Sequence, residues 1–185
     1  SGELVKIDFG KSASINIVSA DQRGVVSIGF TVDAQTGGKK AVAASGLSSG
    51  KVNRGEFEIT PSVVRLNPES GCVGDKIEVS GNGYEANEVI QIDMGDIKSV
   101  AVVQSDENGQ FSSSLIIPIQ IGARDKILKV WGLSSDMGSL RKFEVRQAIL
   151  ISPASGTNGV IISVNGTGFG ADEIIRVDCG NSLGI

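Results

Sequence analysis

The residues of this chain that could carry out chemistry are few, and the sequence contains no histidine to assist them. Histidine is the commonest general base and the commonest ligand of transition metals. The glycine-rich segment Ser-Gly-Asn-Gly-Tyr at 80–84 has the composition of a phosphate-binding loop. Such a loop must lead into the N-terminus of a helix, whereas the residues that follow here have the pattern of a strand. We therefore interpret this segment as a tight turn in which glycine adopts a positive φ.

Acidic residues offer two further candidates. The segment Asp-Glu-Asn-Gly at 106–109 resembles a calcium loop in composition, but calcium needs about six to eight oxygen ligands. We favour a hairpin turn, because the related segment 21–24 carries an arginine instead. Asp8, Asp93 and Asp178 recur at a constant spacing, and we expect them on the solvated face of a sheet, since paired catalytic carboxylates need a cleft. The sequence thus predicts no catalytic residue, metal site or cofactor.

Four single residues have other candidate roles. Trp131 is predicted to point outward, where it could stack on a sugar or contact a protein, with packing under a neighbouring loop as the alternative. Asn165 begins an Asn-Gly-Thr sequence, the acceptor pattern for glycosylation. Cys179 lies on the inward side of its predicted strand and is expected to be a small buried hydrophobe. Cys72 is expected in a loop as an exposed thiol, and no disulfide between the two is predicted.

An internal repeat organises these residues. The segment 66–95 (LNPESGCVGDKIEVSGNGYEANEVIQIDMG) returns at 151–180 as ISPASGTNGVIISVNGTGFGADEIIRVDCG, and part of it occurs at 2–10 as GELVKIDFG. Positions such as Glu3, Glu88 and Glu173 are therefore 85 residues apart. Repeats at a fixed period define where structural units begin and end. We predict the C-terminal part of one unit at 1–59, a complete unit at 60–146 and the N-terminal part of a third at 147–185.

Short alternating apolar segments predict strands throughout, and no segment has helical periodicity. In the complete unit, seven strands with regularly spaced turns indicate an antiparallel β-sandwich. In the first unit, alternation predicts strands near 3–9, 14–19 and 26–32, with further strands at 42–44 and 57–59. The seven strands of the complete unit are expected at 63–67, 76–80, 89–94, 99–104, 110–117, 126–131 and 140–145. The fold class is therefore all-β, in tandem repeats of about 85 residues.

Composition excludes several classes of function. A net charge of −4 argues against a nucleic-acid-binding surface, which requires clustered Lys and Arg. No apolar run approaches the roughly 20 residues that a membrane-spanning helix requires, so we expect no membrane insertion by these residues. Any export signal is expected outside them. With no histidine, no paired nucleophile and no metal constellation, we predict that the chain is not an enzyme.

Several motifs resemble those of a known family. The segments NPESG and SPASG, then SGNGYEANE and NGTGFGADE, then SDENGQFSSSLIIP, are similar to IPT/TIG-type immunoglobulin-like repeats of prokaryotic cell-surface proteins. Such repeats occur in surface-layer (S-layer) proteins and adhesins, and as spacers beside catalytic domains. The resemblance implies an extracellular location at the cell surface or envelope. It implies a structural module and supplies no catalytic residues, because a fold alone does not define a function.

We therefore expect a structural module of a repetitive, exported cell-surface protein, most readily an S-layer or similar envelope lattice component. The alternatives are the repeat stalk of an adhesin and a carbohydrate-binding module that uses Trp131. The expected partners are other copies of the same protein, through lateral or end-to-end contacts, together with glycans in the carbohydrate-binding alternative. In the end-to-end case, the C-terminal unit of one molecule would complete the N-terminal unit of another by strand complementation.

Overall fold

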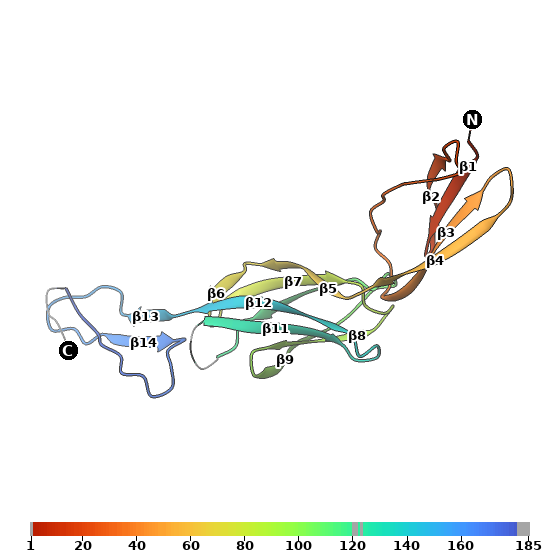
Figure 1. Cartoon of the computed structure of the whole chain (residues 1–185). Coiled ribbons are helices and arrows are strands. Elements are labelled where there is room, and N and C mark those ends of the chain that lie inside the picture. The colour runs from red at the N-terminus through yellow and green to blue at the C-terminus, as the bar shows by residue number, and fades with distance from the viewer. Residues whose placement is uncertain (1, 120–121, 123, 181–185) are drawn as a thin grey trace.

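In a computed structural model, which describes residues 2–119, 122 and 124–180, the chain is all-β and its strands form antiparallel sheets. None of the described residues belongs to a helix that is long and apolar enough to cross a membrane. The three predicted units follow one another along the molecule, and the two termini lie at opposite ends (Figure 1). We refer to them as the N-terminal unit (1–59), the central domain (60–146) and the C-terminal unit (147–185).

The central domain is a sandwich of two sheets. One sheet has the order β10-β7-β5 and the other β6-β12-β11-β8-β9, where only β6 and β12 pair in parallel. Alternate residues of β7 and β11 are buried between the sheets, as a half-buried strand requires. The strands are β5 (Ser62–Asn67), β6 (Ser70–Cys72), β7 (Lys76–Asn82), β8 (Val89–Met94), β9 (Ile97–Gln104), β10 (Phe111–Ile116), β11 (Arg124–Gly132) and β12 (Gly138–Arg146).

The core of this domain consists mainly of aliphatic side chains around one aromatic pair. Tyr84 and Phe111 contact each other edge to face, with ring centroids 5.5 Å apart. The Tyr84 hydroxyl donates a hydrogen bond of 3.3 Å to the Val130 carbonyl, which satisfies its polar end inside the core. The residues buried completely or almost completely with them include Ile77, Val79, Ile90, Ile92, Met94, Ile117, Leu128, Val130, Phe143 and Val145.

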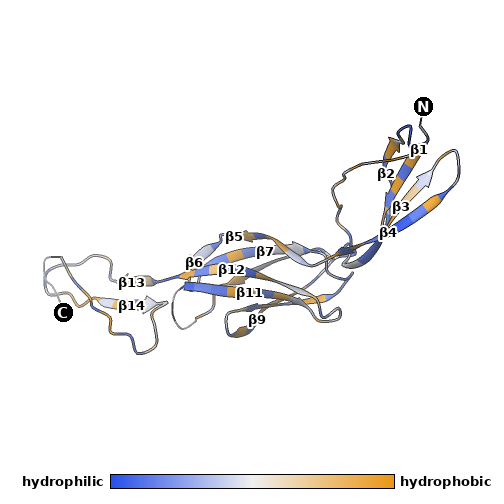
Figure 2. Cartoon of the chain, viewed as in Figure 1, coloured by the Kyte–Doolittle hydropathy of each residue, from blue (hydrophilic) through white to orange (hydrophobic). Residues whose placement is uncertain are grey.

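The N-terminal unit contributes one sheet with the order β2-β1-β3-β4. Its strands are β1 (Leu4–Phe9), β2 (Ser12–Ser19), β3 (Gly38–Gly46) and β4 (Val52–Ile59). Hydrophobic and hydrophilic residues alternate along β1 (Figure 2), so that one face of the sheet is apolar. Phe9 is buried on that face and contacts the rings of Phe30 and Phe57, at centroid distances of 5.6 and 5.8 Å.

The strand predicted at 26–32 does not form. In the central domain the residues 85 positions later belong to β10, which pairs with β7. The sheet of the N-terminal unit contains only β1 to β4 among the described residues, so the backbone of 26–32 has no strand to pair with. Alternation predicted which side chains turn inward, but a strand also requires a hydrogen-bonded neighbour.

The C-terminal unit contains a hairpin of β13 (Ala148–Ser152) and β14 (Ser163–Thr167). β13 lies 85 positions after residues 63–67 of β5, and β14 lies 85 positions after residues 78–82 of β7. β5 and β7 also pair with each other in the antiparallel sense. Most of the apolar residues of the hairpin are exposed, because no second sheet covers them in the described part of the unit. Their exposure contrasts with the complete burial of Ile77 and Val79 in β7.

The same backbone turns recur at the spacing of 85 residues. Ser14 and Ser99 have positive φ values of 53° and 52°, and Gly83 and Gly168 have values of 80° and 81°. Positive φ is uncommon for residues other than glycine, so a serine in this conformation at both positions is a specific feature. These pairs place the same chain reversals at corresponding positions of successive units.

Candidate functional site at the joints between units

The first joint connects the N-terminal unit to the core of the central domain. The Gly37 amide donates a hydrogen bond of 2.9 Å to the carbonyl of Tyr84, whose ring is completely buried in the sandwich. A Cβ atom on Gly37 would lie 2.3 Å from the Gly83 carbonyl oxygen, and one on Gly109 would lie 3.1 Å from the Cα atom of Thr36. Only glycine permits backbones to approach this closely, so the joint is a direct contact.

The second joint repeats the hydrogen bond of the first. The Gly122 amide donates a hydrogen bond of 2.9 Å to the carbonyl of Phe169, and both residues lie 85 positions after their counterparts at the first joint. The close approach is not repeated: a Cβ atom on Gly122 would meet nothing within 4 Å, whereas one on Gly37 would lie 2.3 Å from the Gly83 carbonyl oxygen. The same backbone hydrogen bond therefore links the central domain to both of its neighbours, but only the first joint has a close approach that excludes a side chain.

A buried glutamate, Glu88, holds a loop that reaches the first joint. Its carboxylate accepts backbone hydrogen bonds from Ser134 and Ser135, at 2.9 and 2.6 Å, and from Glu85 at 3.1 Å. These residues belong to the loop after β11 and the turn before β8. The loop continues to Met137, whose Cε atom would lie 2.9 Å from a Cβ atom on Gly37.

The carboxylate of Glu88 is ionised under ordinary conditions. Burial raises its pKa, but hydrogen bonds from Ser135, Glu85 and Ser134 outweigh burial and hold the pKa below its usual value. Glu3 accepts the equivalent bonds from Ser48 and Ser49, at 3.1 and 2.5 Å. The spacing of the glutamates was visible in the sequence, but their role as loop anchors was not predicted.

Asp93 corrects the prediction of a solvated acidic face. It is only 4% exposed, and its carboxylate accepts hydrogen bonds from the Ser99 amide and the Gln91 side chain, both at 2.8 Å, and from Lys98 at 3.1 Å. The register between β8 and β9 shifts beside Asp93, and the left-handed Ser99 turns its amide toward the carboxylate. Burial raises the pKa of Asp93, but the hydrogen bond from Ser99 leads the groups that lower it below its usual value.

Asp8 and Asp178, the other two members of the predicted acidic set, are more open. Asp8 accepts a hydrogen bond of 2.6 Å from the Ser14 amide, the counterpart of the bond from Ser99, and pairs with Lys6. Asp178 pairs with Arg176 at 2.9 Å near the end of the described residues. The recurring aspartate therefore closes a hairpin in the first two units.

Replacement of Asp93 by alanine is expected to lower the free energy of unfolding by about 1–3 kcal/mol, because the Ser99 amide would lose its acceptor. Urea unfolding followed by tryptophan fluorescence measures this change. Asp125→Ala is the matched control, since Asp125 pairs with Lys142 at the surface and such pairs contribute about 0–1 kcal/mol. Equal effects of the two substitutions would contradict a hairpin-closing role for Asp93.

The segment 106–109 is a hydrogen-bonded turn. The Asp106 carboxylate accepts from the amides of Asn108 and Gln110, at 2.8 and 2.9 Å, and Asp21 accepts from Arg23 and Val25 in the same way. Within the described residues, no group of three or more His, Cys, Asp or Glu side chains is placed to hold a metal ion.

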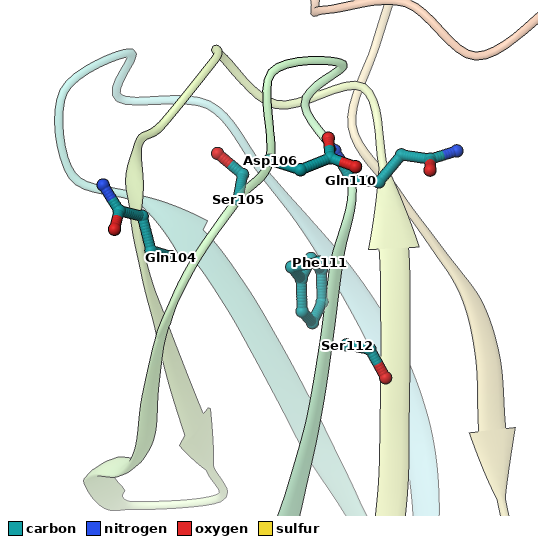
Figure 3. A pocket seen from close by; sticks show the side chains of 6 residues that line it. All are labelled: Gln104, Ser105, Asp106, Gln110, Phe111 and Ser112. Atoms are coloured by element: carbon teal, nitrogen blue, oxygen red, sulfur yellow. The ribbon is translucent and has the colours of Figure 1, made fainter.

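An open hollow of about 420 Å³ lies beside this turn, between β9 and β10. Figure 3 shows the Phe111 ring below the turn that carries Asp106. The Ser105 hydroxyl donates to the Glu85 carbonyl at 2.6 Å and accepts from the Glu88 amide at 2.8 Å. With its hydroxyl held by these two backbone groups, Ser105 supports the turn.

Trp131 lies on β11 and is half-buried. Its indole N–H donates a hydrogen bond of 3.0 Å to Asp136, and the Lys129 ammonium group lies 4.3 Å from the ring centroid. Trp131 is paired across the strands with Gly138, where an added Cβ atom would lie 2.2 Å from the ring. The ring thus packs against Gly138 and beside the loop that Glu88 anchors. This arrangement resembles the alternative prediction for Trp131, in which the ring packs under a neighbouring loop.

The remaining predicted residues lie apart from the joints. Asn165 is exposed in the middle of β14. Cys179 is exposed, which corrects the prediction of a buried residue, because the described part of the C-terminal unit has no second sheet to cover it. Cys72 ends the short strand β6 and is only partly exposed, with its Sγ atom 3.8 Å from the Gln147 carbonyl oxygen. The segment that carries Cys72 was predicted as a loop, but it forms the three-residue strand β6, which pairs with β12.

Comparison with known proteins adds little to this description. No protein-family model matches the chain, and no curated protein matches it. Among solved structures, the chain is similar to the crystal structure of Salmonella alpha-2-macroglobulin reacted with methylamine. That match has a TM-score of 0.30 and 15% sequence identity, and it covers 83% of this chain and 13% of the other. Similarity at this level supports no assignment of family or function.

Proposed function

We propose that this chain is a structural module of a repetitive, exported cell-surface protein, in which immunoglobulin-like units of about 85 residues follow one another. Its work is mechanical: the units hold a fixed separation and orientation, as a lattice component of S-layer type requires. The chemistry described above is consistent with this work, since the carboxylates Glu88, Asp93 and Asp106 all bind backbone amides of their own unit.

The observation that carries the proposal is the repeated joint. Hydrogen bonds of 2.9 Å from Gly37 to Tyr84 and from Gly122 to Phe169 lie 85 residues apart and link successive units in the same way. A flexible linker would need no such contact, and its residues would be free to vary in conformation. A directly bonded joint transmits orientation from one unit to the next, which is what a rigid array needs.

Electron microscopy of the source cell envelope, labelled with an antibody raised against this chain, tests the proposal. The expected result is label at regular intervals over an ordered surface layer. Label confined to scattered fibres would overturn the lattice assignment in favour of an adhesin stalk. Label inside the cell, with none on the envelope, would overturn the surface location altogether.

A further inference from the structure

The outer face of the five-stranded sheet carries an apolar patch near the start of β8. Val89, Val102 and Leu133 are all exposed there, by 41–59%. The Leu133 amide donates a hydrogen bond of 2.9 Å to the Val89 carbonyl, so these two residues are neighbours across the strands. On the other side of β8, Val89 lies opposite Gln104 and Gln91 lies opposite Val102, which places Val102 diagonally across from Val89. We call Val89, Val102 and Leu133 the central patch.

The N-terminal unit has a patch of the same construction. Leu4, Ile17 and Leu47 are exposed by 50–52%. The Leu47 amide donates a hydrogen bond of 2.8 Å to the Leu4 carbonyl, and Ile17 lies diagonally across from Leu4 in the pairing of β1 with β2. Leu4 and Ile17 stand 85 positions before their counterparts in the central patch. We call these three side chains the N-terminal patch.

Both patches face away from the interior of the sandwich. Ile90 in β8 is completely buried, and Ile7 and Phe9 in β1 are buried on the corresponding side. Val89 and Leu4 have the opposite parity along their strands, so their side chains point away from the place of a second sheet. The exposure of each patch is therefore a property of the outer face and does not depend on what covers the inner one.

The composition of the patches favours contact with another copy of this chain. Single exposed apolar residues are ordinary, but neighbouring ones at the same place in successive units indicate an interaction surface. In the edge strands, the residues directly opposite Val89 and Leu4 are Gln104 and Ser19, which carry no charge. Because the chain has a net charge of −4, two copies repel each other least where uncharged surfaces meet.

We propose that the two patches are lateral contacts, through which the outer sheet face of one copy packs on the same face of a second copy. A second copy is the matching partner, because it carries the same two patches at the same spacing, on units that a backbone hydrogen bond joins. A contact between identical surfaces is isologous, with a two-fold axis between the copies. The proposal rests on the proposed function and deepens it, since a lattice needs a lateral contact as well as the joints along the chain.

One patch alone is too small for stable association. A stable interface usually involves about 20–30 residues on each side, far more than three side chains and their neighbours. Two patches on one chain strengthen each other, because the second contact forms between molecules that the first already holds together. We therefore expect association that is weak, reversible and dependent on both patches.

Sedimentation velocity of the 185-residue chain over a series of concentrations should show this association. Val102→Lys and Ile17→Lys should each lower the association constant by about tenfold or more, because each places a charge in the contact. Val64→Lys is the matched control, since Val64 is 61% exposed on β5 in the opposite sheet. Non-specific hydrophobic association would respond to all three substitutions alike.

Urea unfolding followed by Trp131 fluorescence should give the same midpoint for Val102→Lys and Val64→Lys, because both side chains are exposed. If a lysine disturbs the fold, Val102→Thr and Ile17→Thr take its place, since threonine keeps the β-branched shape. A parent chain that stays monomeric at every concentration would overturn the proposal. So would association that is insensitive to either patch, or that Val64→Lys weakens equally.

Cysteine cross-linking tests the face directly, in a chain with Cys72→Ser and Cys179→Ser. The proposed two-fold contact brings the two copies of residue 102 near each other and keeps the two copies of residue 64 apart. A short bismaleimide should therefore give covalent dimers of Val102→Cys and far fewer of Val64→Cys. Equal yields from the two variants would contradict the proposed face.

The location of the protein and its lateral contact can fail separately. Label on an ordered envelope layer, together with a chain that does not associate through these patches, would refute the contact and leave the surface-layer proposal standing. Association through the patches, together with label only inside the cell, would refute the surface-layer proposal and leave the contact between copies standing.

Discussion

Replacement of Ile92 by alanine is expected to lower the free energy of unfolding of the central domain by about 2–4 kcal/mol. Ile92 is completely buried in β8, between Val130 of β11 and Ala101 of β9. Truncation of the Ile92 side chain removes apolar contact area and leaves a cavity, because a close-packed core relaxes only partly around the deleted atoms. Val130→Ala should have an effect of the same size, because Val130 is also completely buried. Urea unfolding at pH 7 measures both.

The matched control is Gln91→Ala, on the neighbouring residue of the same strand. Gln91 is half-buried on the other face and donates one hydrogen bond of 2.8 Å to Asp93, so its replacement should cost about 1 kcal/mol or less. If Gln91→Ala destabilises the domain more than Ile92→Ala, the inward and outward faces of β8 are assigned the wrong way round. A shift of one residue would have that effect on every side chain of the strand.

Replacement of Glu88 by alanine is expected to lower the free energy of unfolding by about 2–4 kcal/mol at pH 7, because amides of Glu85, Ser134 and Ser135 lose their acceptor. The loop after β11 would lose its anchor, and with it the position of Met137 at the joint. Glu107→Ala is the control, since Glu107 is exposed in the Asp106 turn. A similar effect of both substitutions would contradict the role of Glu88.

The same carboxylate makes the domain sensitive to acid. Because the folded state lowers the pKa of Glu88, the unfolded state binds more protons at acid pH, and stability falls as the pH drops. The loss begins near the unfolded value of about 4.3 and continues through the lower folded value. Glu88→Gln should reduce this slope without removing it, because the pKa of Asp93 is also lowered. An unchanged slope between pH 5 and 2, measured by urea unfolding, would contradict the assignment.

The sequence predicted those features that local patterns determine. Alternation located β8 at 89–94, with the observed bounds, and the inward side of β11. It failed at 26–32, because strand formation there depends on a partner that a local pattern cannot supply. It also missed β6, which is three residues long and exists through its pairing with β12.

Buried polar groups were the least predictable part of the candidate site. Asp93 has the alternation of an outward residue, yet the register shift after Ile92 and the positive φ of Ser99 enclose it. Glu88 appeared in the sequence only as a recurring letter, because its partners lie in a loop more than 40 residues away. In both cases the determining contact is a backbone amide, and a sequence does not show where backbone amides point.

The central claim of this account is that the joints hold successive units in a fixed orientation. Residual dipolar couplings of backbone amides test it most directly, measured at a concentration at which the chain sediments as a single species. The account predicts that one alignment tensor fits the amides of β1 to β4 and those of the central domain together. Separate tensors, with a markedly smaller one for the N-terminal unit, would show that the units move independently and would contradict the claim.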